Sequence, residues 1–546
     1  MRKIKRVIGY TLGIAMVLIA AIFLLNLHLT KRLERYLRKE LIHRTAEATG
    51  GFYRLSFDNL SISFFKGELT LEGIKLCPDS AVFRDWERKD SLPSVYVTAE
   101  VGMIDFKGLN LTWRWSYKQL HFDSFEIRNP DIQVFNPYYS TRAEVKERKE
   151  AEIKTLYEVV SPYINVLTVR ILNLENASVS YSVENPVSPI VYALNDVSFH
   201  AYGFRLDENS SESGKLLYCD NFDFITKRSQ TLLANNDFRL QTDRILLSTE
   251  DSIISISNIT LTPQGELWGE QKKRPDSYLN ALIRAIEVKG IQFRRENALN
   301  YLTARSLDII SSDIQAFNLA GESLPSAKKT EKKSLNEAEA DSLVRSLSLY
   351  ELISPVLHTV SIGTVGIGQA KLQYSFAVKD KIEVYKLANF DFQANDFRID
   401  SVSETQRGFW YSRGFSFEAT GIEGLMTARN HRFTVKRMTL DTESGDFNLE
   451  RIRLYPLSVC GQNDYMAGSI DTVGIRGLLY DKGISARLLK IDRPNLRYVL
   501  VSSFNKKDVK SVKPANSRVD VESILNPFLR YFSVKRLSLN HASVTI

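Results

Sequence analysis

The sequence has few cysteines and histidines, and both are scattered. The three cysteines (Cys77, Cys219 and Cys460) are too few and too dispersed for a disulfide framework, so we expect buried or half-buried thiols. No pair among the seven histidines has the spacing of metal ligands. The chain also lacks a nucleophile elbow, a phosphate-binding glycine-rich loop, Cys-x-x-Cys and His-Glu-x-x-His. We therefore expect no enzyme, no catalytic residues, no metal and no cofactor.

Two polar clusters resemble sites but have simpler interpretations. The segment Asp441–Asp446 lacks the glycine and glutamate positions of a calcium loop, which favours a solvated turn between strands. Arg205 and Asp207 recur as Arg398 and Asp400. A repeated Arg-x-Asp at a strand end is most often an exposed ion pair, and we expect one here.

The excess of positive charge is modest. Lys and Arg total 72 against 64 for Asp and Glu, giving a net charge of +8. The basic residues are spread through the chain and are not gathered with stacking aromatics, so we expect no nucleic-acid partner. Much of the surplus flanks the N-terminal apolar segment, where anionic lipid head groups are the simplest partner.

One long uncharged segment, Val7–Leu29, is long enough to cross a hydrocarbon core of ~30 Å. Basic residues precede it, which places the N-terminus in the cytoplasm. A cleaved signal peptide is the alternative, but the apolar region is longer than usual and no cleavage motif follows it. The expected anchor residues are Val7, Ile8, Leu12, Ile14, Val17, Leu18, Ile19, Ile22, Phe23, Leu24 and Leu25.

Beyond Tyr53 the apolar residues alternate with polar ones in short runs, as in Leu55–Phe57 and Leu60–Phe64. This period of two predicts β-strands with one apolar face. Counting such runs gives about 25–30 strands and few helices. We therefore predict a mainly β protein with an elongated, curled antiparallel sheet and short helices between its repeats.

An internal repeat organises the body of the chain. Residues 156–207 align without a gap to residues 349–400, an offset of 193, with 16 identities in 52 positions. A partial third copy begins near Pro527, and three charged segments separate the units. The predicted parts are a cytoplasmic basic tail (1–6), the anchor (7–29), an amphipathic juxtamembrane helix (30–50), an N-terminal β segment (51–137), a linker (138–155), repeat 1 (156–320), a linker (321–342), repeat 2 (343–503), a linker (504–518) and a partial repeat 3 (519–546).

The apolar face of so many strands needs a cover. Open sheets of more than ~10 strands curl, split or close, and no predicted helix is long enough to cover the face. The sheet must therefore close into sandwiches or form a trough with an apolar lining. In the second case the candidate lining residues are Phe57, Ile62, Phe64, Leu69, Leu71, Tyr181, Phe199, Phe204, Tyr374, Phe392 and Phe397.

The first 76 residues resemble the N-terminal signature of AsmA-like proteins. A membrane helix is followed by an amphipathic helix, Thr30–Ala48, with Leu33, Leu37 and Leu41 on one face, and then by the strands of Leu55–Leu76. The strand-Pro-strand segments Phe125–Phe135 and Leu489–Leu500 look like the repeating strands of the same family. The resemblance implies an inner-membrane anchor, a periplasmic β-groove and a role in moving lipids towards the outer membrane.

Two functions therefore compete. The first is a single-pass inner-membrane protein with a periplasmic body that shields or transports lipids, phospholipids above all, and supports envelope biogenesis. The second is a non-enzymatic scaffold of the cell envelope, with closed β-sandwich repeats that bind other envelope proteins. An open apolar face favours the first function, and a closed one favours the second.

Overall fold

The computed structural model describes residues 31–63, 66–89, 95–114, 117–136, 164–183, 190–210, 215–233, 238–263, 277–296, 299–318, 357–378, 381–406, 411–458, 465–480, 484–499 and 532–545, with residues 93, 157 and 161. The predicted membrane helix (7–29) and the three charged linkers lie outside them. Within the described part, no helix is both long and apolar enough to span a membrane.

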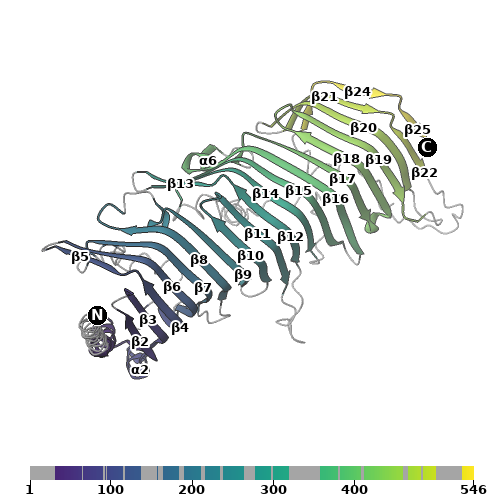
Figure 1. Cartoon of the computed structure of the whole chain (residues 1–546). Coiled ribbons are helices and arrows are strands. Elements are labelled where there is room, and N and C mark those ends of the chain that lie inside the picture. The colour runs from purple at the N-terminus through teal and green to yellow at the C-terminus, as the bar shows by residue number, and fades with distance from the viewer. Residues whose placement is uncertain are drawn as a thin grey trace, which may run out of the picture. The chain divides into compact units, whose positions relative to one another are not determined.

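The described chain is mainly β and divides into two compact units, Met1–Ile256 and Ser257–Ile546. Figure 1 shows the strands of each unit following one another along the chain. The strands of the first unit are β1 (Tyr53–Ser56), β2 (Asn59–Ser63), β3 (Glu68–Pro78), β4 (Tyr96–Lys107), β5 (Asn110–Arg114), β6 (Tyr117–Asn136), β7 (Val166–Val183), β8 (Ile190–Leu206), β9 (Asn221–Leu233) and β10 (Phe238–Ser248). β11 (Ile253–Pro263) runs across the boundary between the units.

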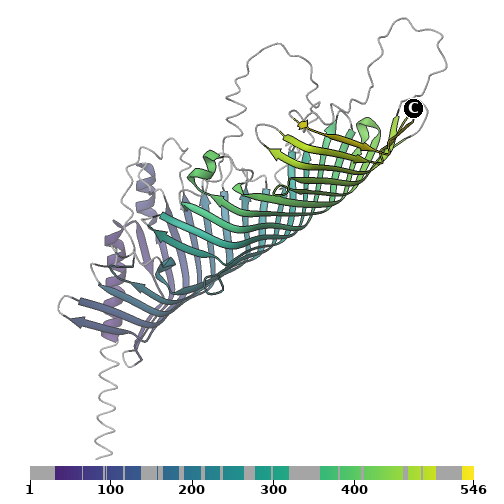
Figure 2. The same cartoon turned by 90° about the horizontal axis from the view of Figure 1, so that it is seen from above.

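The strands of the second unit are β12 (Ser277–Lys289), β13 (Gln292–Glu296), β14 (Leu299–Asn318), β15 (Thr359–Val378), β16 (Lys381–Ile399), β17 (Gly414–Met426), β18 (His431–Asp441), β19 (Asp446–Pro456), β20 (Tyr465–Tyr480), β21 (Ile484–Asp492), β22 (Asn495–Val499), β23 (Phe532–Val534), β24 (Leu537–Asn540) and β25 (Ser543–Thr545). In each unit the strands pair into one sheet. Figure 2 shows that neighbouring strands of a unit curve in the same sense.

The sheets are mixed but largely antiparallel, so the prediction of an antiparallel sheet is confirmed in part. Most pairs are antiparallel, but β6 pairs in parallel with β7, and β14 with β15. β21 and β22 likewise pair in parallel with β23, β24 and β25. Parallel partners need a long crossover between them. The three charged linkers of the sequence lie at these three crossovers.

The repeat of 193 residues is visible strand by strand. The bounds of β9, β10 and β11 differ from those of β17, β18 and β19 by 193 positions at both ends. Side-chain contacts repeat as well, because Thr249 Oγ1 accepts from the Phe222 amide and Thr442 Oγ1 accepts from the Phe415 amide. The two copies therefore share their register.

Several short elements have no counterpart in the sequence predictions. α2 (Ser80–Arg88) begins after Asp79, whose carboxylate accepts from the amides of Ala81 and Val82. The Phe52 ring stacks on Trp86 of this helix, with ring centroids 4.9 Å apart. Other short helices are η1 (Leu216–Tyr218), α6 (Ser401–Gln406) and η4 (Thr427–Arg429).

Cys77 is exposed, contrary to expectation, whereas Cys219 is buried.

The repeated Arg-x-Asp motif forms an ion pair in both copies. Arg205 and Arg398 each donate from Nε to the carboxylate two residues later, over 2.6 Å. The arginine side chains are exposed, whereas those of Asp207 and Asp400 are only 14% and 10% exposed. Burial raises the pKa of Asp400, but hydrogen bonds from Arg398 and Ser403 outweigh it and lower the pKa to about 2. The pKa of Asp207 is lowered as well.

We predict that Asp400→Asn removes an acid-sensitive part of the stability. Since the folded pKa lies below the unfolded value of ~3.9, the carboxylate stabilises the fold above roughly pH 4. That contribution is lost as the pH falls through about 2. The variant should lose about 1–2 kcal/mol at neutral pH and depend less on pH between roughly 4 and 2, measured by urea unfolding. Glu208→Gln, at an exposed position of the first copy, should change neither quantity.

Candidate functional site

Apolar side chains form unbroken rows across the second unit. Residues paired across neighbouring strands share a face of the sheet. One row joins Ile286, Ile309, Ile367, Phe392, Phe417, Leu440, Phe447, Ile475, Leu489 and Leu537. The row beside it joins Ala370, Phe390, Ala419, Met438, Leu449, Val473, Ile491 and Leu539. This set of rows is called the apolar face below.

The opposite face of the same strands is polar. One row joins Asn389, Thr420, Arg437, Glu450, Thr472, Asp492 and Asn540. Ion pairs and hydrogen bonds link its members to each other and to neighbours. Arg437 donates from Nε and Nη2 to both Glu418 oxygens, and Asn540 donates to Asp492 over 2.7 Å. The sheet is therefore two-faced across the unit.

The first unit has the same organisation. An apolar row joins Leu60, Leu71, Ile104, Ile127, Leu174, Phe199, Phe224 and Leu247. On the other face, a polar row joins Ser61, Thr70, Asp105, Glu126, Asn173, His200, Asp223 and Ser248. Thr70 donates to Asp105 over 2.7 Å within this row. Both units therefore separate apolar from polar side chains in the same way.

A line of left-handed residues crosses the strands of each unit. In the second unit it includes Ser311, Gln369, Gly421 and Arg451, with φ between 50° and 64°. At this line the spacing of apolar residues changes from two to three, as between Ala419 and Ile422. A left-handed residue re-aims the side chains that follow it. We infer that the apolar face continues across the line instead of switching sides.

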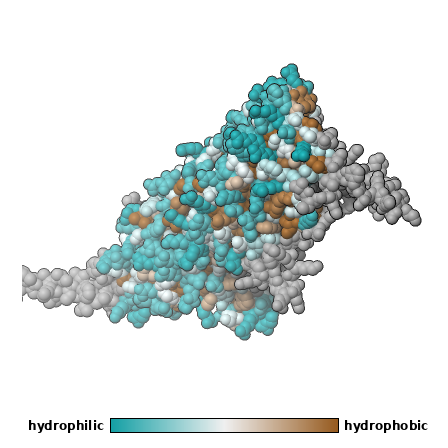
Figure 3. All heavy atoms as spheres, turned by 90° about the vertical axis from the view of Figure 1, so that its right-hand side faces the viewer, coloured by the Kyte–Doolittle hydropathy of each residue, from teal (hydrophilic) through white to brown (hydrophobic). Residues whose placement is uncertain are grey.

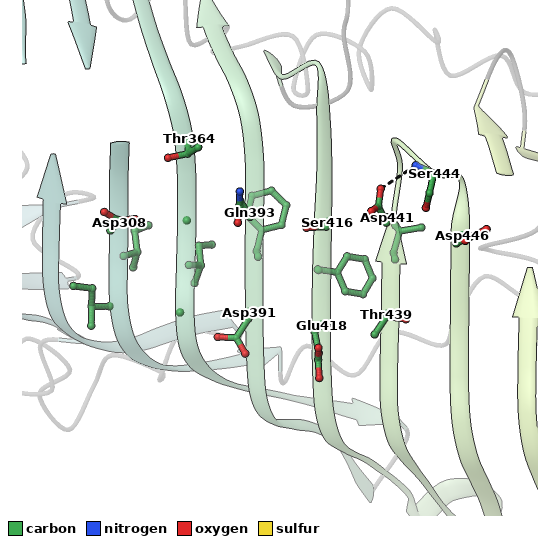
Figure 4. A pocket seen from close by; sticks show the side chains of 18 of the residues that line it. Asp308, Thr364, Asp391, Gln393, Ser416, Glu418, Thr439, Asp441, Ser444 and Asp446 are labelled. Atoms are coloured by element: carbon green, nitrogen blue, oxygen red, sulfur yellow. Dashed lines mark hydrogen bonds between the residues drawn. The ribbon is translucent and has the colours of Figure 1, made fainter. Parts of the chain in front are cut away.

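A groove of about 870 Å³ lies over the middle of the second unit. Apolar-face residues Ile309, Ile367, Phe392, Phe417 and Leu440 line it. Polar residues from the same strands also line it, and Figure 4 shows Asp308, Thr364, Asp391, Glu418 and Asp441 on successive strands. Figure 3 shows apolar residues gathered in patches beside polar ones on the side turned to the viewer.

Many apolar side chains of the described strands are only half-buried. One buried cluster in the second unit consists of Phe392, Ala394 and Phe415, with half-buried neighbours around it. Leu537 and Leu539, at the ends of the two apolar rows, are 64% and 57% exposed. A single layer of sheet leaves such side chains half in water, which is costly unless a ligand or partner covers them.

A helix over residues 31–48 covers the first strands of unit 1, so the expectation that no helix covers the face fails there. Leu37 of this helix packs against the cluster of Phe57, Leu60 and Ile74. Arg38 donates to the backbone oxygens of Phe57 and Asp58 over 3.0 and 2.9 Å. Its guanidinium also lies 4.5 Å from the centre of the Phe57 ring. These contacts hold the helix on the first strands.

The candidate lining residues have different positions. Phe57 is buried under the helix, and Phe64 and the anchor residues lie outside the described chain. Phe204 and Phe397 are half-buried and make edge contacts with Tyr218 and Tyr411, each pair with ring centroids 6.3 Å apart. Tyr181 lies against Tyr192 at 6.2 Å. The structure places the remaining candidates in apolar rows: Ile62, Leu69, Leu71, Phe199, Tyr374 and Phe392.

An aromatic cluster that the sequence did not predict extends the apolar face beyond the left-handed line. Phe376 stacks on Tyr385 at 5.6 Å, and Phe433 lies 5.9 Å from Tyr385. Gly424 is paired with both Tyr385 and Phe433. A methyl group on Gly424 would overlap the Phe433 ring, so a glycine is required here.

The described residues contain no group of three His, Cys, Asp or Glu side chains that could hold a metal ion. A scan against protein-family models and a search of curated proteins find no match to this chain. The site is therefore defined by its own geometry, an apolar face with a groove.

We predict that Gly424→Ala displaces Phe433 and destabilises the fold. Overpacking of this kind costs about 1–3 kcal/mol, measurable as a lower urea midpoint. Gly368→Ala is the matched control, because the nearest atom to its new methyl group would be Asp391 Oδ1 at 3.9 Å. An equal loss in both variants would contradict the role given to Gly424.

Proposed function

We propose that this chain is an AsmA-like, single-pass inner-membrane protein whose periplasmic body shields or transports lipids towards the outer membrane. The supporting observation is the apolar face, whose rows run without a polar residue across successive strands of each unit. Acyl chains are the ligand that matches such a face, since they need cover from water along their length and no directional contacts.

The groove in the second unit supports the proposal. Phe392 and Phe417 line it and are paired across β16 and β17, with the rings of Phe390 and Phe415 beside them. Aromatic and aliphatic side chains in a concave surface are the usual lining of sites for apolar ligands. Of the polar-face residues that line it, Glu418 is paired with Arg437, and Asp391 accepts hydrogen bonds from Asn389 and from the Gln369 amide.

We predict that a photo-crosslinking amino acid at position 392 captures lipid in living cells. The same amino acid at position 389 should not, because Asn389 lies in the polar row of the same strand and does not line the groove. Both variants are made in the full-length chain and tested by mass spectrometry of the crosslinked product. Capture of lipid at neither position, or equally at both, would contradict the proposal. Capture of protein at position 392 would favour the scaffold function instead.

A further inference from the structure

The two copies of the repeat carry different charges on the polar face of the sheet, next to the line of left-handed residues. In the second copy, Lys436, Arg451 and Arg453 lie on β18 and β19. The equivalent positions of the first copy, 193 residues earlier, carry Asp243, Asn258 and Thr260. The backbone is the same in both copies, since Asn258 and Arg451 are both left-handed, with φ of 49° and 51°. The basic side chains are therefore not required by the fold.

A glycine in the second copy, where the first copy has an arginine, leaves space beside these cations. In the first copy, Arg228 occupies the left-handed position on β9 and pairs with Asp196 over 2.6 Å. In the second copy the equivalent residue is Gly421, with φ of 64°. The second unit has a hollow of about 320 Å³ here, lined by Gly421, Ile422, Glu423, Thr434, Val435, Lys436, Arg451 and Arg453.

The charges in this hollow do not cancel. Its one carboxylate, Glu423, is paired with Arg432 over 2.5 Å. Neither Lys436 nor Arg451 forms an ion pair with a residue that the structure describes. Arg453 has only a long contact of 3.5 Å to the Tyr455 hydroxyl. Three cations on two neighbouring strands therefore line a small hollow, and no carboxylate in the hollow is left to pair with them.

We propose that this hollow in the second unit binds a phosphate group. Arginine and lysine together match a multiply charged oxyanion, since arginine offers paired donors and lysine a compact charge. The Thr434 hydroxyl lies in the same hollow and supplies a further donor. The group belongs either to a soluble phosphate or to a phospholipid head group. The site does not depend on the apolar face.

The test uses the full-length chain in detergent, titrated with inorganic phosphate in a calorimeter. It is also floated with vesicles of phosphatidylcholine, with and without phosphatidic acid. Arg451→Asn and Lys436→Asp restore first-copy residues and should weaken binding roughly tenfold or more, as loss of a charge-assisted contact predicts. Lys386→Ala also restores a first-copy residue and removes a cation outside the hollow, so it should leave binding unchanged.

Binding of phosphatidic acid vesicles without inorganic phosphate assigns the group to a lipid head group, and the reverse assigns it to a soluble phosphate. Binding of neither overturns the proposal. An equal loss in Lys386→Ala and Arg451→Asn also overturns it, because general charge would then explain the binding. Circular dichroism of each variant confirms that the comparison is made on folded protein.

Discussion

The register between neighbouring strands is the constraint on which the rest of the structure depends. Each strand alternates apolar and polar side chains, and a slip of one residue would move every side chain to the other face. The pairing instead places Phe392 beside Phe417, and Phe417 beside Leu440. Across ten strands of the second unit, an apolar residue of one strand is paired with an apolar residue of the next. The result is a sheet with one apolar and one polar face, and both the groove and the polar rows follow from this arrangement.

The line of left-handed residues is the second constraint. It lets the strands bend while the apolar face continues, and it recurs in both copies at Asn176 and Gln369, and at Arg228 and Gly421. The residues along it differ in chemistry, so the backbone conformation is kept while side chains vary. This freedom explains how the second copy acquired a hollow with three cations where the first copy has a neutralised pair.

The sequence predicted the mainly β class, the repeat and several residues of the apolar face because alternation and self-similarity are local signals. It did not predict the parallel pairs, because alternation is the same whichever way the neighbouring strand runs. The left-handed line was also missed, since Ser311, Gln369 and Arg451 share no recognisable signature. Phe57 alternates like a lining residue, but the helix over residues 31–48 covers it, and Phe204 and Phe397 make edge contacts with Tyr218 and Tyr411.

If the apolar face carries lipid, that lipid should remain bound when the folded chain leaves the membrane. Native mass spectrometry of the full-length chain, released from its membrane, tests it most directly. Additional masses that match bound phospholipid are expected, and they should be reduced when Phe392 is replaced by aspartate but not when Asn389 is. A chain that is folded and free of lipid in every charge state would contradict the account.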